Sequence, residues 1–194
     1  MDDKAAKLFH LGAGLPGARL WGDAIDSQGA RIDEIRTALR QLPQFRDTSR
    51  EELEMAGRLI WEAHFLVIAM RQLLRTQERY SELTGNERLV TARADFDAAV
   101  PNAKTFRDFL EHLDEYLLNR GNLQRSGSIA PGTELLVDHA RRTGRVTLRF
   151  DNLSLDLCEA AEAALQLADV TADVWFEHVM DAMKEDGGSG VIRP

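Results

Sequence analysis

A short stretch of the chain holds an arginine, two carboxylates and a histidine at helical spacing. Asp108 precedes His112 by four residues and Glu115 follows it by three, so one face of a helix would carry all three side chains. A carboxylate beside an imidazole fixes its tautomer and raises its pKa, which suits acid–base catalysis. Arg107 lies at the edge of that face and is long enough to reach an anion held at His112. The pattern therefore indicates a candidate site for acid–base chemistry on an anionic substrate.

The six residues 107–112 (Arg-Asp-Phe-Leu-Glu-His) resemble the motif of HEPN-type helical domains, in which an arginine, a polar residue and three further residues precede a histidine. The resemblance implies a small antiparallel bundle that pairs as a homodimer and cuts RNA without a metal, with the motifs of both subunits meeting in a cleft. His112 would then act as acid or base on the ribose 2′-hydroxyl or the leaving group. Arg107 would hold the scissile phosphate, and Asp108 would orient the pair. Such a ribonuclease would fit a toxin–antitoxin or phage-defence system.

Two other interpretations of this stretch stay open. In the first, it is an ordinary solvated helix face whose charges pair locally. In the second, Asp108, His112 and Glu115 bind a divalent metal, which needs further ligands from a second helix; Glu62 and His64 are the candidates. We expect neither a metal nor a cofactor.

A second feature is the concentration of arginine between residues 120 and 149 of an otherwise acidic chain. Arginine suits phosphate because its planar guanidinium offers two parallel hydrogen bonds. One interpretation is an RNA- or phosphate-binding flap over the helix that carries the motif, and the other is that charges on an exposed hairpin edge discourage aggregation. The candidate RNA- or phosphate-binding residues are Arg141, Arg142, Arg145 and Arg149, with Arg120 and Arg125 nearby.

Composition defines the class of protein. The chain has 194 residues, 44% hydrophobic and 29% charged, as expected for a globular domain with one sizeable core. The net charge of −8 argues against bulk binding to nucleic acid or anionic membranes, but leaves room for a local basic site. The longest strongly apolar run, Phe65 to Met70, is far shorter than the roughly 20 residues that span a bilayer. Cys158 is the only cysteine, so no disulfide forms within the chain, and we expect a cytoplasmic protein without a membrane partner.

Hydrophobic periodicity predicts five amphipathic helices. The clearest follows three candidate N-caps, Asp47, Thr48 and Ser49, and ends at 84–86; two apolar stripes place it at the centre of a bundle. Alternating apolar residues at 146–150 predict a strand that pairs with 135–140 across a turn at 141–144. The remaining helices are predicted at 18–42, 87–99, 103–120 and 155–184.

These elements predict a mainly α protein, an antiparallel bundle of about five helices with a small β-hairpin insertion before the last helix. One domain would span 18–185, with the loop and hairpin insertion at 121–152, a weakly ordered N-terminus at 1–17 and a flexible tail at 186–194. Trp21, Trp61 and Trp175 lie on or near apolar stripes, where core packing or a dimer seam explains them.

The leading functional hypothesis is a homodimeric helical-bundle protein that acts as a protein-interaction or regulatory module. The alternative is the metal-independent ribonuclease that the resemblance implies, with RNA as its partner. The ribonuclease hypothesis requires that Arg107 and His112 are both accessible to solvent and converge on one place.

Overall fold

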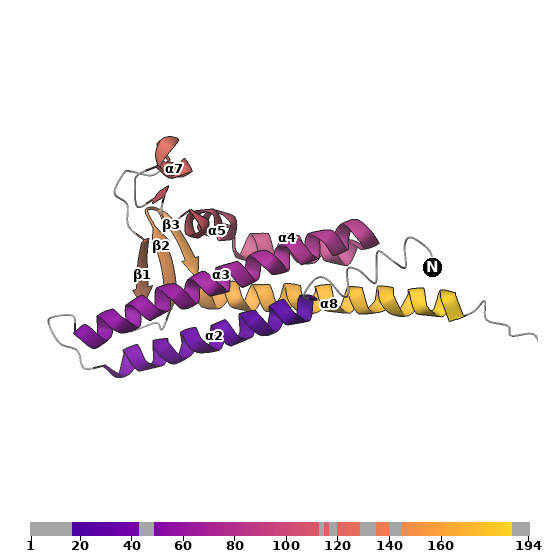
Figure 1. Cartoon of the computed structure of the whole chain (residues 1–194), viewed down its shortest axis with the longest axis horizontal. Helices are drawn as coiled ribbons and strands as arrows, with labels where there is room; N and C mark the ends of the chain where they lie inside the picture. Colours follow the sequence, from indigo (N-terminus) through magenta and orange to yellow (C-terminus); the bar gives the residue numbers. More distant parts are fainter. Residues whose placement is uncertain are drawn as a thin grey trace, which may run out of the picture.

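Three long helices form the body of the molecule. The computed structural model describes residues 17–42, 49–112, 115–116, 120–128, 135–139 and 145–187. In it, α2 (Ala18–Gln41), α3 (Arg50–Thr84) and α8 (Leu157–Gly187) lie along the long axis, and each packs against the other two (Figure 1). The mainly α fold predicted from the sequence is therefore confirmed. None of the described helices combines the length and the apolar character that a membrane crossing requires.

Small residues allow α2 and α8 to approach closely. A Cβ atom built on Gly22 would lie 3.2 Å from the Cβ of Ala168, and one built on Gly29 would lie 3.8 Å from the Cβ of Ala161. The two contacts are seven residues apart on each helix and run in opposite sequence order, so the helices are antiparallel with a two-turn repeat along their interface.

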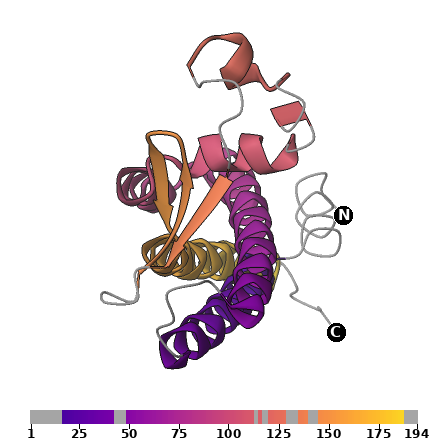
Figure 2. The ribbon, with the colours of Figure 1, turned by 90° about the vertical axis from the view of Figure 1, so that its left-hand side faces the viewer.

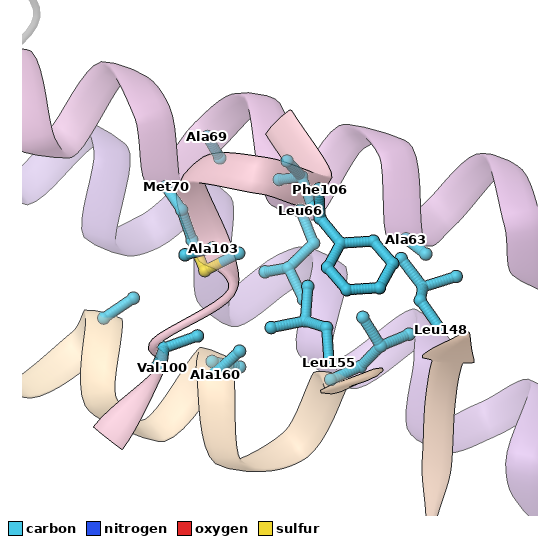
Figure 3. Close-up of a cluster of buried hydrophobic side chains, with 14 of the residues drawn as sticks. Ala63, Leu66, Ala69, Met70, Val100, Ala103, Phe106, Leu148, Leu155 and Ala160 are labelled. Atoms are coloured by element: carbon cyan, nitrogen blue, oxygen red, sulfur yellow. The ribbon is translucent and has the colours of Figure 1, made fainter. Parts of the chain in front are cut away.

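The helix α3 lies at the centre of the bundle, as its two apolar stripes predict. Ser49 caps it, because the Ser49 hydroxyl accepts a hydrogen bond from the backbone N–H of Glu52 at 3.1 Å. Its inner faces contact α2, α8, the shorter helices and the first strand. The core around it draws on elements far apart in the sequence (Figure 3); the labelled members are Ala63, Leu66, Ala69, Met70, Val100, Ala103, Phe106, Leu148, Leu155 and Ala160.

The helix α4 (Glu87–Ala99) has the bounds that the sequence predicts, and it packs along α8. The Nη1 atom of Arg88 lies 2.9 and 2.8 Å from the two carboxylate oxygens of Glu177. Beneath this pair, the rings of Tyr80 and Trp175 stack with centroids 4.5 Å apart. These contacts attach α4 to the end of α8 remote from the sheet.

A small antiparallel sheet packs on the bundle on the side away from α2 (Figure 2). Its order is β1 (Leu135–His139), β2 (Val146–Phe150) and β3 (Leu153–Asp156). The predicted hairpin is confirmed in β1 and β2, whose register pairs Val137 with Leu148. The alternate residues Val146, Leu148 and Phe150 are buried, as their period-two pattern predicts.

The third strand corrects the predicted start of the last helix at 155. Leu155 pairs with Leu148 in the sheet, and the helix begins only at Leu157. Asp156 caps it, since its Oδ1 accepts hydrogen bonds from the backbone N–H groups of Cys158 and Glu159 at 3.0 and 3.1 Å. At the other end α8 continues to Gly187, so the tail predicted at 186–194 begins two residues too early. The predictions for residues 1–16 and 188–194 lie outside the described residues.

The helix predicted over 103–120 is not continuous: it is interrupted after nine residues, residues 115–116 are helical again, and residues 113–114 and 117–119 lie outside the described residues. Its first part is α5 (Ala103–Glu111), and the loop predicted to follow contains a single helical turn, α7 (Asn122–Arg125). Aromatic packing explains the break. On a continuous helix Tyr116 would lie about 10 Å along the axis from Phe109. The structure instead brings the two rings to a centroid separation of 4.7 Å, with Phe150 of β2 3.9 Å from Phe109.

Candidate functional site

The motif arginine is held by its neighbour. The Nε atom of Arg107 lies 2.8 Å from the Oδ1 of Asp108, and its Nη2 contacts the same oxygen. Phe109, two residues on, points about 200° away around the helix into the aromatic cluster with the sheet. Arg107 therefore lies on the flank of α5 that faces α3, with 29% of its side chain exposed.

The motif histidine follows the end of α5 and is not part of a continuous helix. His112 is the C-cap residue, and 53% of its side chain is exposed. Its Nδ1 lies 3.3 Å from the Oε1 of Glu115. Arg107 and His112 are thus both accessible to solvent, which the ribonuclease hypothesis requires. They do not line a common cavity among those found in the described part of the chain: Arg107 lines a cleft to which His112 does not contribute.

That cleft lies between α3, α4 and α5 and has a volume of ≈ 60 Å³. Its rim is basic and includes one carboxylate, that of Asp97, which lies 2.9 Å from the Nε of Arg93. Its floor is apolar and includes Met70 and Ala103, which also belong to the core in Figure 3. The basic residues that line the cleft are Arg71 from α3, Arg93 from α4, and Lys104 and Arg107 from α5.

Arg71 is the most constrained of these cations. Its Nη1 pairs with the carboxylate of Glu111, while its Nε is buried without a hydrogen-bond partner among the described residues. Burial, together with the positive charges of Arg75 and Arg107, lowers the pKa of Arg71, and the nearby Asp108 partly opposes this effect. No local sequence pattern indicates Arg71, Arg93 and Lys104 as site residues, because each lies on a different helix and only the fold brings them together.

The arginines of the hairpin form no common site with this cleft in the described residues. Arg141 and Arg142 lie outside the described residues. Arg145 is exposed and forms ion pairs with Asp156 at 3.7 Å and Glu159 at 2.8 Å, beside a separate cavity of ≈ 280 Å³ at the start of α8. Arg149 is exposed on β2. The described strands pack on α5 through the aromatic cluster, on the flank away from the cleft, so none of the described residues of the predicted flap lines the cleft.

The described residues contain no cluster of His, Cys, Asp and Glu able to hold a metal ion. Asp108, His112 and Glu115 therefore form no ligand cluster in the part of the chain that the structure describes. Asp108 is engaged by Arg107, and Glu62, one of the proposed extra ligands, lies 3.7 Å from Arg31 of α2 instead.

A second candidate surface is the outward face of α3. Trp61 and Phe65, one helical turn apart, leave 63% and 52% of their surface exposed. The ring of His64 lies nearly parallel to that of Trp61, at a 7° interplanar angle and a centroid distance of 6.3 Å. Core packing, one of the two explanations predicted for Trp61, is thus wrong for this residue, whereas Trp175 does pack against Tyr80.

Neither a family model nor a curated protein nor a solved structure matches the chain. The resemblance to HEPN-type domains therefore rests on residues 107–112 alone. Two surfaces of the described residues are candidates for function: the basic cleft and the aromatic face of α3.

Proposed function

We propose that the protein is a protein-interaction module whose docking surface is the outward face of α3, and that two copies of the chain pair through this face. The exposed pair of Trp61 and Phe65 carries the proposal. Large aromatic side chains dominate the binding energy of protein interfaces, and a contiguous exposed apolar patch marks an interaction site. Burying the exposed part of Trp61 would contribute roughly 3 kcal/mol per copy before the costs of association.

The arrangement of side chains along this face supports a second copy as the occupant. Its centre is apolar, two acidic residues lie at its N-terminal end and two basic residues lie at its C-terminal end, with one further arginine directly before the centre. The spacing alternates between three and four residues, as in helices that pair side by side. The face consists of Glu51, Glu54, Arg58, Trp61, Phe65, Ile68, Gln72, Arg75 and Arg79.

An antiparallel pair about a two-fold axis near residue 63 brings the aromatic residues of the two copies together and pairs the charge of Glu51 with that of Arg75. Trp61 then meets the partner's Phe65, and symmetry makes the same contact twice. Glu51 and Arg75 lie twelve residues on either side of the axis, so Glu51 meets the partner's Arg75. Both side chains are exposed in the single chain. The result has an aromatic centre and a charged rim, the usual anatomy of an interface.

The proposal includes the cytoplasm as the location. Cys158 at the start of α8 is half-buried and free. Burial, followed by the charge of Asp156, raises the pKa of its thiol. A thiol held protonated in this way is a poor nucleophile and suits a reducing compartment.

The oligomeric state of three proteins tests the proposal: wild type, Trp61→Glu, and Phe176→Glu as the matched control. Phe176 is 61% exposed on α8, so the control introduces the same charge on another helix. We expect sedimentation velocity to show a dimer for wild type and the control. Trp61→Glu should raise the dissociation constant at least about 100-fold, as expected for a central aromatic residue. A wild-type monomer at every concentration, or equal dimerisation of all three proteins, would contradict the proposal.

A HEPN-type ribonuclease is the second candidate, because Arg107 and His112 both reach solvent. The test is cleavage of a labelled mixed-sequence RNA in excess EDTA by wild type, His112→Ala and, as a control, His178→Ala. Cleavage that only His112→Ala loses would support the ribonuclease. Cleavage by all three proteins would assign the activity to a contaminant.

A further inference from the structure

The cleft between α3, α4 and α5 concentrates positive charge in an acidic protein. Four cationic side chains and the carboxylate of Asp97 line it, and two carboxylates outside the lining, Glu111 and Asp108, pair with Arg71 and Arg107. Four positive and three negative charges leave an excess of one positive charge, although the whole chain carries a net charge of −8. The larger hollow of ≈ 490 Å³ beside α2 and α3 offers no such excess, because its two arginines are matched by two glutamates. Of the three cavities described here, the small cleft is therefore the one whose charge favours a bound anion.

The cations of the cleft keep donors available. A guanidinium has five N–H groups in a planar fork. Arg71 uses Nη1 for Glu111 and leaves its buried Nε without a partner in the described part of the chain. Arg93 uses Nε for Asp97. Lys104 is exposed at the rim and forms no ion pair with a described residue. Donors from three helices therefore remain for a ligand.

We propose that this cleft binds a single phosphate group, either as inorganic phosphate or as a phosphomonoester whose remaining atoms stay in solvent. A volume of ≈ 60 Å³ is suited to one such group and to little more. Phosphate offers the tetrahedral set of acceptor oxygens that arginine forks bind in pairs. The apolar floor of Val67, Met70 and Leu74 limits solvent screening, so each contact between the anion and a cation is stronger than at an open surface.

Binding would also stabilise the fold. The anion would join α3, α4 and α5 and would relieve the repulsion between Arg71 and Arg107. The site lies on the flank of α3 that faces α5 and does not require the dimer proposed above. A dimer would change the phosphate affinity by a few-fold at most, so failure of the dimer would leave this test standing.

The experiment follows the thermal unfolding midpoint across a series of inorganic phosphate concentrations, with chloride added to keep the ionic strength constant. A second series uses phenyl phosphate, to distinguish the free ion from a monoester. The proteins are wild type, Lys104→Ala, Arg107→Gln and the control Arg19→Ala, which removes an exposed cation from α2 outside the cleft. Ligand that binds only the folded protein raises the midpoint, and the concentration dependence gives the dissociation constant.

We expect phosphate to raise the midpoint of wild type and of Arg19→Ala alike. Lys104→Ala and Arg107→Gln should each weaken the apparent affinity by about tenfold, the usual effect of one charged hydrogen bond. A rise with phosphate alone assigns the site to the free ion, and a larger rise with phenyl phosphate assigns it to a monoester. No rise in wild type, or the same rise in all four proteins, would overturn the proposal. Lys104→Ala keeps the test decisive even if Arg107→Gln fails to fold, since Lys104 is exposed and unpaired among the described residues.

Discussion

The antiparallel register of the proposed dimer can be tested by exchanging two charges. In that register Glu51 near the start of α3 meets the partner's Arg75, and the symmetry of the dimer makes this pair twice. Glu51→Arg replaces two attractions by two repulsions, and Arg75→Glu does the same with the opposite sign. The double variant, Glu51→Arg with Arg75→Glu, restores both attractions with their signs exchanged.

The expected magnitude follows from the exposure of both side chains. An exposed ion pair contributes roughly 0.5 kcal/mol, and a like-charge pair at the same separation costs about as much. Two pairs lost and two repulsions gained change the free energy of dimerisation by about 2 kcal/mol, which is roughly a 30-fold change in the dissociation constant. The effect should shrink at high salt, because exposed charges are screened.

Sedimentation velocity over a concentration series measures this change for wild type, both single variants and the double variant. Glu51→Arg also removes an acidic residue from the first turn of α3, where it interacts favourably with the helix dipole. Urea unfolding of each variant therefore distinguishes a loss of folding stability from a weaker dimer. We expect each single variant to dimerise about 30-fold more weakly than wild type and the double variant to return to within a few-fold of wild type. A double variant as weak as the single variants would refute the antiparallel register. Single variants equal to wild type would place both charges outside the interface.

Two further predictions concern stability. Gly22→Leu should lower the free energy of unfolding by about 1–3 kcal/mol, because even its Cβ would lie 3.2 Å from the Cβ of Ala168. The control Gly57→Ala should be neutral or stabilising by up to about 1 kcal/mol, because an added Cβ there meets nothing within 4 Å. Urea unfolding measures both changes. Burial lowers the pKa of His64, so the unfolded chain binds more protons than the native one as the pH falls below the ordinary histidine value. Wild type should therefore lose stability between about pH 7.5 and 5.5 relative to His64→Gln, and parallel pH profiles of the two proteins would show that burial of this imidazole is not linked to folding.

Local signals predict the parts of the fold that local interactions determine. The bounds of α4 agree with the prediction because Asn86 caps its start, accepting a hydrogen bond from the backbone N–H of Arg88 at 2.9 Å, and Pro101 follows its end. The strand β2 agrees because its alternation matches a sheet with one buried face. Local signals do not single out the capping residue: Asp47, Thr48 and Ser49 are all suited to cap α3, and the structure uses Ser49.

The errors occur where distant contacts override local periodicity. Residues 103–120 have the apolar spacing of one helix, yet Tyr116 packs on Phe109 and Phe150, and this three-ring cluster requires the chain to turn after His112. The start of the last helix differs from the prediction for the same reason. An apolar residue at 155 suits both a helix and a strand, and only the pairing of Leu155 with Leu148 makes it part of a strand. The motif residues were predicted on one continuous face, and the early end of α5 removes that face.

The two proposed sites share α3, on which Arg75 of the dimer face lies one turn from Arg71 of the cleft, so they should influence each other. Arg75 is at the rim of the proposed dimer, and its charge contributes to the lowered pKa of Arg71 in the cleft. In the dimer the partner's Glu51 would offset the charge of Arg75 and reduce the positive potential that attracts phosphate to Arg71. Binding free energies are linked, so phosphate should in turn weaken dimerisation, by a few-fold at most for groups this exposed. Sedimentation of wild type with and without phosphate, at constant ionic strength, measures this coupling. Arg75→Gln should abolish this coupling, because the variant removes the charge that both sites share. Tighter dimerisation in phosphate would contradict a coupling through charge and would indicate a change in helix packing.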